Sequence, residues 1–217
     1  SKDEAVVSMN SMLRSNSTLE DFCRSYFMFH DLDINQPREI FRFLPILSFT
    51  ESYIYQLDGL NEELVLSPGM MEEHGTNVCT KMMWKEPFKP LVAVLESSGL
   101  LTERIEKEFE CGEEYWALER KLCSSLVNNK EISIQDAKRA IHLKSFDYRV
   151  LNLILYRLRG EEVNEVHMEF LSISELLVEV SDDLFIEMDD VLKNNFNILR
   201  MFVKYYGPSD APIMMVR

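Results

Sequence analysis

Two clusters of acidic residues have the spacing that metal-ion chemistry requires. The first occupies positions 58–63, where Asp58 and Glu62 stand four residues apart. If this segment is helical, both carboxylates lie on one face of the helix. Gly59 between them leaves room for the close approach of a ligand or a neighbouring helix.

The second cluster occupies positions 179–190. At about 100° per residue, four of its acids fall in one stripe of a helix: Glu179, Asp183, Glu187 and Asp190. Like charges at this spacing repel one another and destabilise a helix. Water, lysines or a divalent cation must therefore offset the repulsion.

Paired carboxylates of this kind suit the activation of a diphosphate. Mg²⁺ usually binds one or two carboxylates and completes its shell with water and substrate phosphate. Two facing pairs could hold several Mg²⁺ ions and draw a diphosphate from an allylic carbon, while an apolar cavity shelters the carbocation. The alternative is that both clusters are solvated surfaces, because 37 acids in 217 residues create such pairs by chance.

The net charge limits the partners of the chain. It is −14, with an isoelectric point near 4.8. Nucleic-acid binding needs clustered cations that neutralise phosphates, and an anionic membrane repels an acidic protein. We therefore expect neither nucleic acid nor a membrane surface as a partner.

The hydrophobic content and the number of glycines and prolines predict the fold class. A hydrophobic content of 46% supplies a packed core, and the length suits one domain, 1–217. Seven glycines and seven prolines favour helices over turn-rich sheets. We predict an all-α protein, a single antiparallel helical bundle.

Positions 67–77 contain a proline and two glycines and are expected to form a mobile loop. Positions 209–217 end without a closing signal, which leaves open a C-terminal truncation.

Several signals predict helix boundaries. A capping box at 17–20 predicts a helix start, and Pro45 predicts a kink or an end. The Cys-Gly pair at 111–112 is expected to separate two helices. Positions 136–159 predict one long helix, and 161–206 are expected to be mostly helical, in one or two pieces.

Location is predicted from what the sequence lacks. Positions 1–4 show no signal-peptide pattern. The alternative that a targeting peptide preceded position 1 and was removed stays open. The longest apolar stretches, such as 41–49, are too short to span a bilayer, so no transmembrane segment is expected. The four cysteines stand far apart, which favours free thiols in a reducing compartment over two disulfides. We therefore expect a cytoplasmic location.

Four short segments occur in an order that resembles a known enzyme family. Positions 23–27 are Cys-Arg-Ser-Tyr-Phe, and positions 56–62 hold Asp-Gly-Leu-Asn-Glu. Positions 146–150 are Phe-Asp-Tyr-Arg-Val, and positions 183–187 are Asp-Leu-Phe-Ile-Glu. The order, and the 125 residues between the starts of the two acidic motifs, resemble the head-to-head isoprenoid synthases, the squalene and phytoene synthases, in divergent form.

The resemblance implies an isoprenoid-synthase-like bundle and a set of metal ligands. In that family two acidic motifs bind Mg²⁺, which here implies four ligands: Asp58, Glu62, Asp183 and Glu187.

The resemblance also implies contacts to the substrate. The early Arg-Ser-aromatic segment of the family holds diphosphate, which corresponds to Arg24, Ser25 and Tyr26. Tyr148, in the Asp-Tyr run, is the candidate catalytic residue, and no protein base is otherwise identifiable.

Two departures from the family pattern bear on catalysis more than on fold. Asn61 stands where the family has an acid. After the Asp-Tyr run, the family's small residues are replaced by Leu151, Leu153 and Leu155, which are expected to fill the space of a prenyl chain.

Two functional hypotheses therefore stand side by side. The first is an isoprenoid-synthase-like protein, a transferase or cyclase, that binds a prenyl diphosphate or another apolar small molecule through Mg²⁺. The second is a non-catalytic helical interaction protein with a protein partner or a second copy of itself. A carboxylate di-iron enzyme is disfavoured because the sequence has no Glu-x-x-His pair at the needed places.

Overall fold

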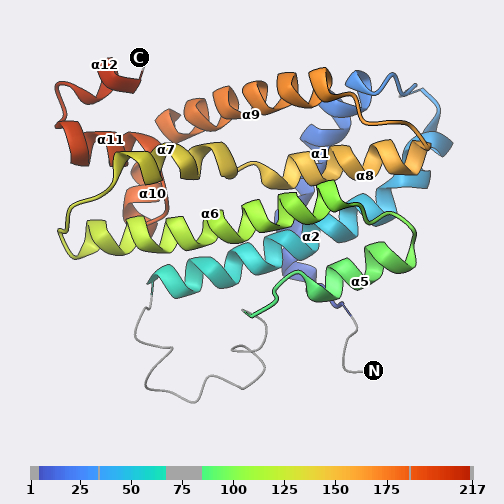
Figure 1. Ribbon diagram of the computed structural model, residues 1–217, viewed down its shortest axis with the longest axis horizontal. Coiled ribbons are helices and arrows are strands. Elements are labelled where there is room, and N and C mark those ends of the chain that lie inside the picture. The colour runs from blue at the N-terminus through green and yellow to red at the C-terminus, as the bar shows by residue number, and fades with distance from the viewer. Residues whose placement is uncertain (1–4, 34, 67–84, 186, 216–217) are drawn as a thin grey trace. The chain divides into compact units, whose positions relative to one another are not determined.

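The computed structural model describes residues 5–33, 35–66, 85–185 and 187–215 (Figure 1). Within these residues every regular element is a helix, which confirms the all-α prediction. None of the described helices combines the length and the apolar character needed to cross a bilayer. The mobile loop predicted at 67–77 lies outside the described residues.

The chain divides into two compact units, and the single domain predicted over 1–217 stays a prediction. Each unit is assembled from three separate segments, so no single boundary in the chain divides them. Unit 1 comprises Ser1–Leu60, Gly75–Phe109 and Asp147–Asn164. Unit 2 comprises Asn61–His74, Glu110–Phe146 and Glu165–Arg217.

Unit 1 is built from α1, α5, most of α2 and α8, and the first turns of α6. Their bounds are Met9–Phe29 for α1, Pro37–Leu66 for α2, Lys89–Ser97 for α5, Glu103–Val127 for α6 and Phe146–Arg159 for α8. Fully buried side chains from four of these helices form its core: Phe22, Phe27, Leu47, Leu91, Leu95 and Ile154.

The first helix starts earlier than the capping box at 17–20 predicts. Ser8 is the N-cap of α1, and its hydroxyl accepts a hydrogen bond of 3.1 Å from the backbone N–H of Ser11. Thr18, inside the predicted box, is buried instead, and its hydroxyl lies 2.5 Å from that of Tyr55 on α2.

Pro45 lies inside α2 and does not end it, contrary to one of the two expectations for this residue. Proline removes one backbone donor from a helix. Phe43 and Leu47 on either side of it are buried in the core. Packing supplies most of the stability of a helix in a protein, so it can outweigh the lost bond.

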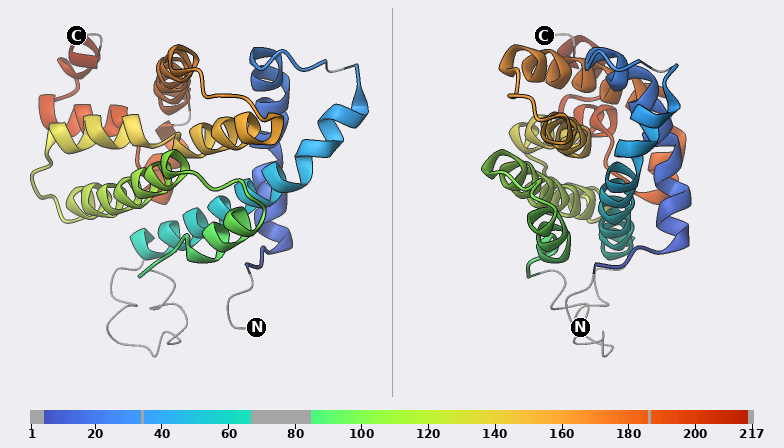
Figure 2. Two further views of the ribbon diagram at one scale, coloured as in Figure 1. Left: turned by 45° about the vertical axis from the view of Figure 1, so that its right-hand side comes forward. Right: turned by 90° about the vertical axis from the view of Figure 1, so that its right-hand side faces the viewer.

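Unit 2 is built from the rest of α6, from α7 and from α9 to α12. Their bounds are Ile134–Leu143 for α7, Glu165–Phe185 for α9, Glu187–Lys193 for α10, Ile198–Tyr206 for α11 and Ala211–Met215 for α12. The three helices α7, α9 and α11 pack against one another. Figure 2 shows α7 and α11 side by side in further views.

The long helix predicted at 136–159 is two helices in the structure. α7 ends at Leu143, and α8 begins at Phe146. Lys144 and Ser145 form the turn between them, and their side chains reach acids on α9. These tertiary contacts explain a break that local helix propensity does not predict.

Gly112 does not separate two helices, because α6 runs through it without interruption. A Cβ atom at this position would lie 2.5 Å from two ring carbons of Phe146. The Phe146 ring is buried and meets Trp116 edge-on, with 5.6 Å between ring centroids. Gly112 is therefore the residue that lets this aromatic pair approach α6.

Replacement of Gly112 by alanine tests this packing. Helix propensity alone would make Gly112→Ala stabilising by about 1 kcal/mol. We expect a lower free energy of unfolding instead, by roughly 1–3 kcal/mol, because the added methyl group overpacks Phe146. Urea unfolding measures the change. Glu110→Ala, at an exposed position of the same helix, is the control and should stay within about 0.5 kcal/mol of the parent. A stabilised Gly112→Ala variant would contradict the packing.

Candidate functional site

Two acids of the second cluster, Glu179 and Asp183, lie on the inner face of α9. Asp183 is fully buried, and its Oδ1 atom lies 2.8 Å from Nζ of Lys144. Its Oδ2 atom accepts a hydrogen bond of 2.6 Å from the backbone N–H of Ile198. Glu179, one turn earlier, places Oε2 at 2.8 Å from the same ammonium group. Ser145 donates a hydrogen bond of 2.7 Å to the other oxygen of Glu179.

Lys144 thus supplies the positive charge that the stripe of acids requires. Burial lowers the pKa of Lys144, but the charges of Glu179 and Asp183 outweigh this effect and raise the pKa above its usual range. For Asp183, burial is the largest effect and raises the pKa of the carboxyl, against the opposing pull of Lys144 and of the Ile198 N–H. The ammonium group therefore stays charged, and both oxygens of Asp183 already have donors.

The same network joins the end of α9 to α10 and α11. Asn197, the N-cap of α11, donates hydrogen bonds of 2.7 Å to the backbone carbonyl of Asp183 and 2.9 Å to Oδ2 of Asp190. Asn197 and Asp190 are both buried. The stripe that contains the predicted metal ligand Asp183 therefore organises the helix junction of unit 2. Glu187 begins α10, but its side chain lies outside the described residues.

The first acidic cluster lies on α2. Asp58 is half-buried in unit 1, and Glu62 is half-buried in unit 2. Asn61, which replaces an acid of the family motif, is fully buried and donates a hydrogen bond of 2.6 Å to Oε2 of Glu119. Its carbonyl accepts a bond from Arg120. The amide therefore has a packing role that a carboxylate beside Glu119 could not fill.

Gly59 allows the close approach of a neighbouring helix, which is one of the two approaches expected at this position; the other was that of a ligand. A Cβ atom there would lie 2.8 Å from Nη1 of Arg14 on α1. The Arg14 guanidinium also lies over the ring of Tyr55, 5.8 Å from its centroid.

The predicted diphosphate contacts are only partly brought together. Arg24 and Ser25 are exposed on α1, where Arg24 pairs with Glu20 on its own helix. Tyr26 turns toward Tyr148 on α8, with 5.4 Å between the ring centroids. Burial, and then the charge of Asp147, raise the pKa of Tyr148, so its hydroxyl stays protonated and is suited to donating rather than accepting a proton.

Unit 1 contains an acidic group that the sequence analysis missed. Glu51 on α2 is fully buried, and among the described residues no N–H or hydroxyl group donates a hydrogen bond to either of its oxygens. Burial is the main cause that raises its pKa, followed by the charge of Asp147, a side-chain hydrogen bond to Asp147 and the charge of Asp58. Two ionised carboxylates cannot bond to each other, so the bond to Asp147 exists only when a proton is shared.

The surroundings of Glu51 are aromatic. Tyr55 and Tyr148 both experience the charges of Glu51 and Asp147. The one signal in the sequence is that Glu51 is the only charged residue between Phe43 and Leu57, a segment otherwise apolar or uncharged. The described residues hold no group of three or more His, Cys, Asp or Glu side chains arranged to bind a metal ion.

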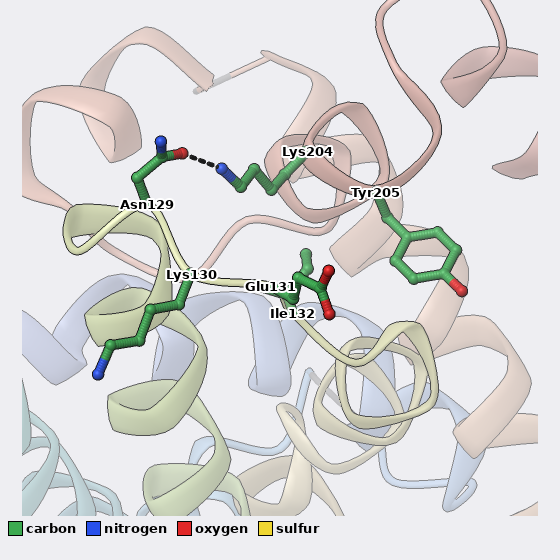
Figure 3. A pocket seen from close by; sticks show the side chains of 6 residues that line it. All are labelled: Asn129, Lys130, Glu131, Ile132, Lys204 and Tyr205. Carbon is green, nitrogen blue, oxygen red and sulfur yellow. Dashed lines mark hydrogen bonds between the residues drawn. The ribbon is translucent and has the colours of Figure 1, made fainter.

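A surface pocket of unit 2 lies between the α6–α7 connection and α11 (Figure 3). Its two cations come from Lys130 and Lys204. Lys204 donates a hydrogen bond of 2.5 Å to Asn129. The side chain of Lys130 points away from Lys204. The cations do not converge, so the pocket offers little to an anion.

The outward face of α9 is apolar over its whole length. Seven of its large apolar side chains are exposed, Val178 and Phe185 among them, and the other five lie in one row: Val166, Phe170, Ile173, Leu177 and Leu184. With the half-buried Val180, they follow one another at intervals of 4, 3, 4, 3 and 4 residues. The opposite face carries Glu175 and Asp183, which are buried. α9 thus buries two carboxylates together with Met168 and Leu171 and exposes a row of hydrocarbon, unlike a usual surface helix, which exposes its polar face.

Comparisons with known proteins identify no relative. No family model matches the sequence, and no curated protein or solved structure matches it. The isoprenoid-synthase-like fold, the Mg²⁺ site and the site residues therefore stay predictions.

Removal of Lys144 tests the polar network. We expect Lys144→Met to lower the free energy of unfolding by about 3–5 kcal/mol, because it leaves the buried Asp183 carboxylate without a counter-charge. Urea unfolding at neutral pH measures this change. Lys130→Met, at an exposed site of the same unit, is the matched control and should change stability little. A Lys144→Met variant as stable as this control would contradict the network.

The raised pKa of Glu51 predicts a pH dependence of stability. The folded state holds the proton of Glu51 more tightly than the unfolded state does. The resulting stability is complete below the ordinary pKa of 4.5 and is lost as the pH rises through the folded value. We expect Glu51→Gln to raise the free energy of unfolding at pH ~8 by roughly 1–3 kcal/mol, the cost of an unsatisfied buried group. Its advantage over the parent should shrink toward pH ~4, where the parent carboxyl is protonated.

Chemical unfolding across the pH range measures the effect. Glu63→Gln, at an exposed position of the same helix, should leave the pH profile unchanged. If Glu51→Gln gave the profile of the parent, Glu51 would not be the titrating group.

Proposed function

We propose that the chain is a non-catalytic helical interaction protein that binds an amphipathic helix of a partner protein through the outward face of α9. The observation that supports this function is the continuous exposed apolar row on that helix. Monomeric proteins seldom expose large contiguous apolar patches, and those that exist often mark interaction sites. Single exposed apolar residues need no explanation, but this row covers every turn of one helix.

The spacing of the row favours a helix as the occupant. Intervals of 4 and 3 residues repeat every 3.5 residues on average, which is the period of a coiled-coil seam. Side chains at this period can interlock with those of a second helix along the whole contact. At about 1.5 Å per residue, the 21 residues of α9 offer a seam roughly 30 Å long.

A defined peptide tests this docking. A fluorescent helical peptide of 21 residues, the length of α9, carries leucine at the same intervals and glutamine elsewhere. We expect the full chain to bind it, and Ile173→Ser/Leu177→Ser to weaken binding by about tenfold or more, since each buried aliphatic side chain contributes about 1.5–3 kcal/mol. Fluorescence anisotropy measures the affinity.

The matched control is Met9→Ser/Leu13→Ser, which removes two exposed apolar side chains, also four residues apart, from α1. Equal affinities of both double variants would mean that α9 is not the docking surface. Absence of any binding to the parent chain would contradict the proposed function.

A second candidate function is the binding of a prenyl diphosphate through Mg²⁺. The specific observation in its favour is the buried Glu51 carboxyl beside Asp58 and Asp147, with Tyr26 and Tyr148 in ring contact nearby. Mg²⁺ needs only one or two carboxylates when phosphate oxygens complete its shell. The engagement of Asp183 by Lys144 argues against this candidate, as does the burial of three leucines that follow Tyr148: Leu151, Leu153 and Leu155.

Thermal unfolding with Mg²⁺ and farnesyl diphosphate tests the second candidate. Specific binding at ligand concentrations about 100-fold above the dissociation constant stabilises the fold by roughly 2.7 kcal/mol, which raises the melting temperature. Asp58→Asn should abolish the shift, whereas Glu63→Gln should retain it. No shift in the parent chain at millimolar ligand would remove this candidate.

A further inference from the structure

We propose that a groove between α1 and α2 binds a small, uncharged apolar molecule whose N–H group donates to the backbone carbonyl of Phe41. The groove encloses about 470 Å³, within the usual range of small-molecule sites, roughly 300–1,000 Å³. All the residues that line it belong to unit 1. The inference is independent of the function proposed for α9, and either can fail without the other.

Most of the wall of the groove is apolar. Leu19 and Cys23 line it from α1, and Leu44 and Pro45 line it from α2. Burial raises the pKa of the Cys23 thiol, so this side chain stays uncharged and adds to the apolar wall. The lining covers about two turns of α1 and little more than one turn of α2. This length suits a small molecule rather than the seam of a second helix.

Pro45 leaves a backbone acceptor beside the groove. In an α-helix the carbonyl of Phe41 accepts from the N–H of residue 45, and proline has no N–H. Because α2 continues through Pro45, the Phe41 carbonyl lacks its usual donor in the interior of a helix, next to a residue of the lining. An N–H group of a ligand in the groove takes the place of the missing amide.

Two polar side chains of the groove are also available to a ligand. Neither Asn16 nor Ser48 forms a side-chain hydrogen bond with another described residue. Ser48 is half-buried, and a helical serine often bonds to the carbonyl four residues earlier, as Ser125 and Ser181 do in this chain. The Ser48 hydroxyl does not, so it can bond to a polar atom of a molecule in the groove.

The charges at the groove favour an uncharged ligand. Among the described residues of the lining, Glu20 is the charged one, and it forms an ion pair with Arg24. An anionic ligand would compete with Glu20 for this pairing, and a cationic ligand would compete with Arg24. Burial of a charge against Leu19 and Leu44 is also costly unless the charge is paired. A neutral N–H group avoids both costs.

Two probes of nearly the same shape test the inference. Indole carries the N–H donor, and benzofuran has an oxygen atom in its place. We expect indole to bind the full chain about threefold to tenfold more tightly than benzofuran, the factor that one hydrogen bond between neutral groups supplies. Methyl NMR of the leucine residues follows both titrations. The resonances of Leu19 and Leu44 should shift, and those of the buried Leu122 in unit 2 should not.

Two variants locate the acceptor and the groove. Pro45→Ala restores the amide that the Phe41 carbonyl lacks. This variant should be at least as stable as the parent in urea and should lose the preference for indole over benzofuran. Asn16→Trp fills the groove from its exposed rim and should abolish the binding of both probes. Ser17→Trp, at an exposed position of α1 outside the lining, is the matched control and should leave binding unchanged.

Three results would overturn the inference. The first is equal affinity of the parent chain for indole and benzofuran. The second is the absence of shifts at Leu19 and Leu44 with indole at millimolar concentration. The third is a preference for indole that survives in Pro45→Ala, because the Phe41 carbonyl would then not be the acceptor. The first two come from the parent chain, so they do not depend on whether a variant folds.

Discussion

The buried contact of Lys144 with Glu179 and Asp183 is the constraint on which the organisation of unit 2 depends. A carboxylate without a counter-charge is very costly to bury, so these two acids require the ammonium group. The contact ends α7, because Lys144 occupies the turn that follows it. It also fixes which face of α9 turns inward. Through Asp183 it reaches the start of α11, where the Ile198 N–H completes the site.

The orientation of α9 follows from this contact. The face of α9 that holds Asp183 turns inward, and the row on the other side of the helix is exposed: Val166, Phe170, Ile173, Leu177 and Leu184. The same rotation that would bury them would expose Lys144 and its partners to water and dissolve the network. The apolar exterior is therefore the counterpart of the polar interior.

The sequence predicts helices well here and long-range electrostatics poorly. Local rules identify the all-α class, and a local contact starts α7, where the Ser133 hydroxyl accepts from the Asp136 N–H. They also mark the acid stripe of α9 and require a counter-charge for it. They cannot say that Lys144 supplies that charge, because this depends on a contact across 39 residues. The role of Gly112 is missed for the same reason, since its partner is the distant Phe146 ring.

Hydroxyl-radical footprinting of the full chain, read by mass spectrometry, tests the orientation of α9 most directly. Methionine is oxidised more readily than phenylalanine or leucine, so intrinsic reactivity alone would favour Met168. Because Met168 is buried and Phe170 and Leu177 are exposed, the account predicts oxidation of Phe170 and Leu177 and protection of Met168. Oxidised Met168 with protected Phe170 and Leu177 would show that α9 turns its hydrocarbon inward, and would contradict the account.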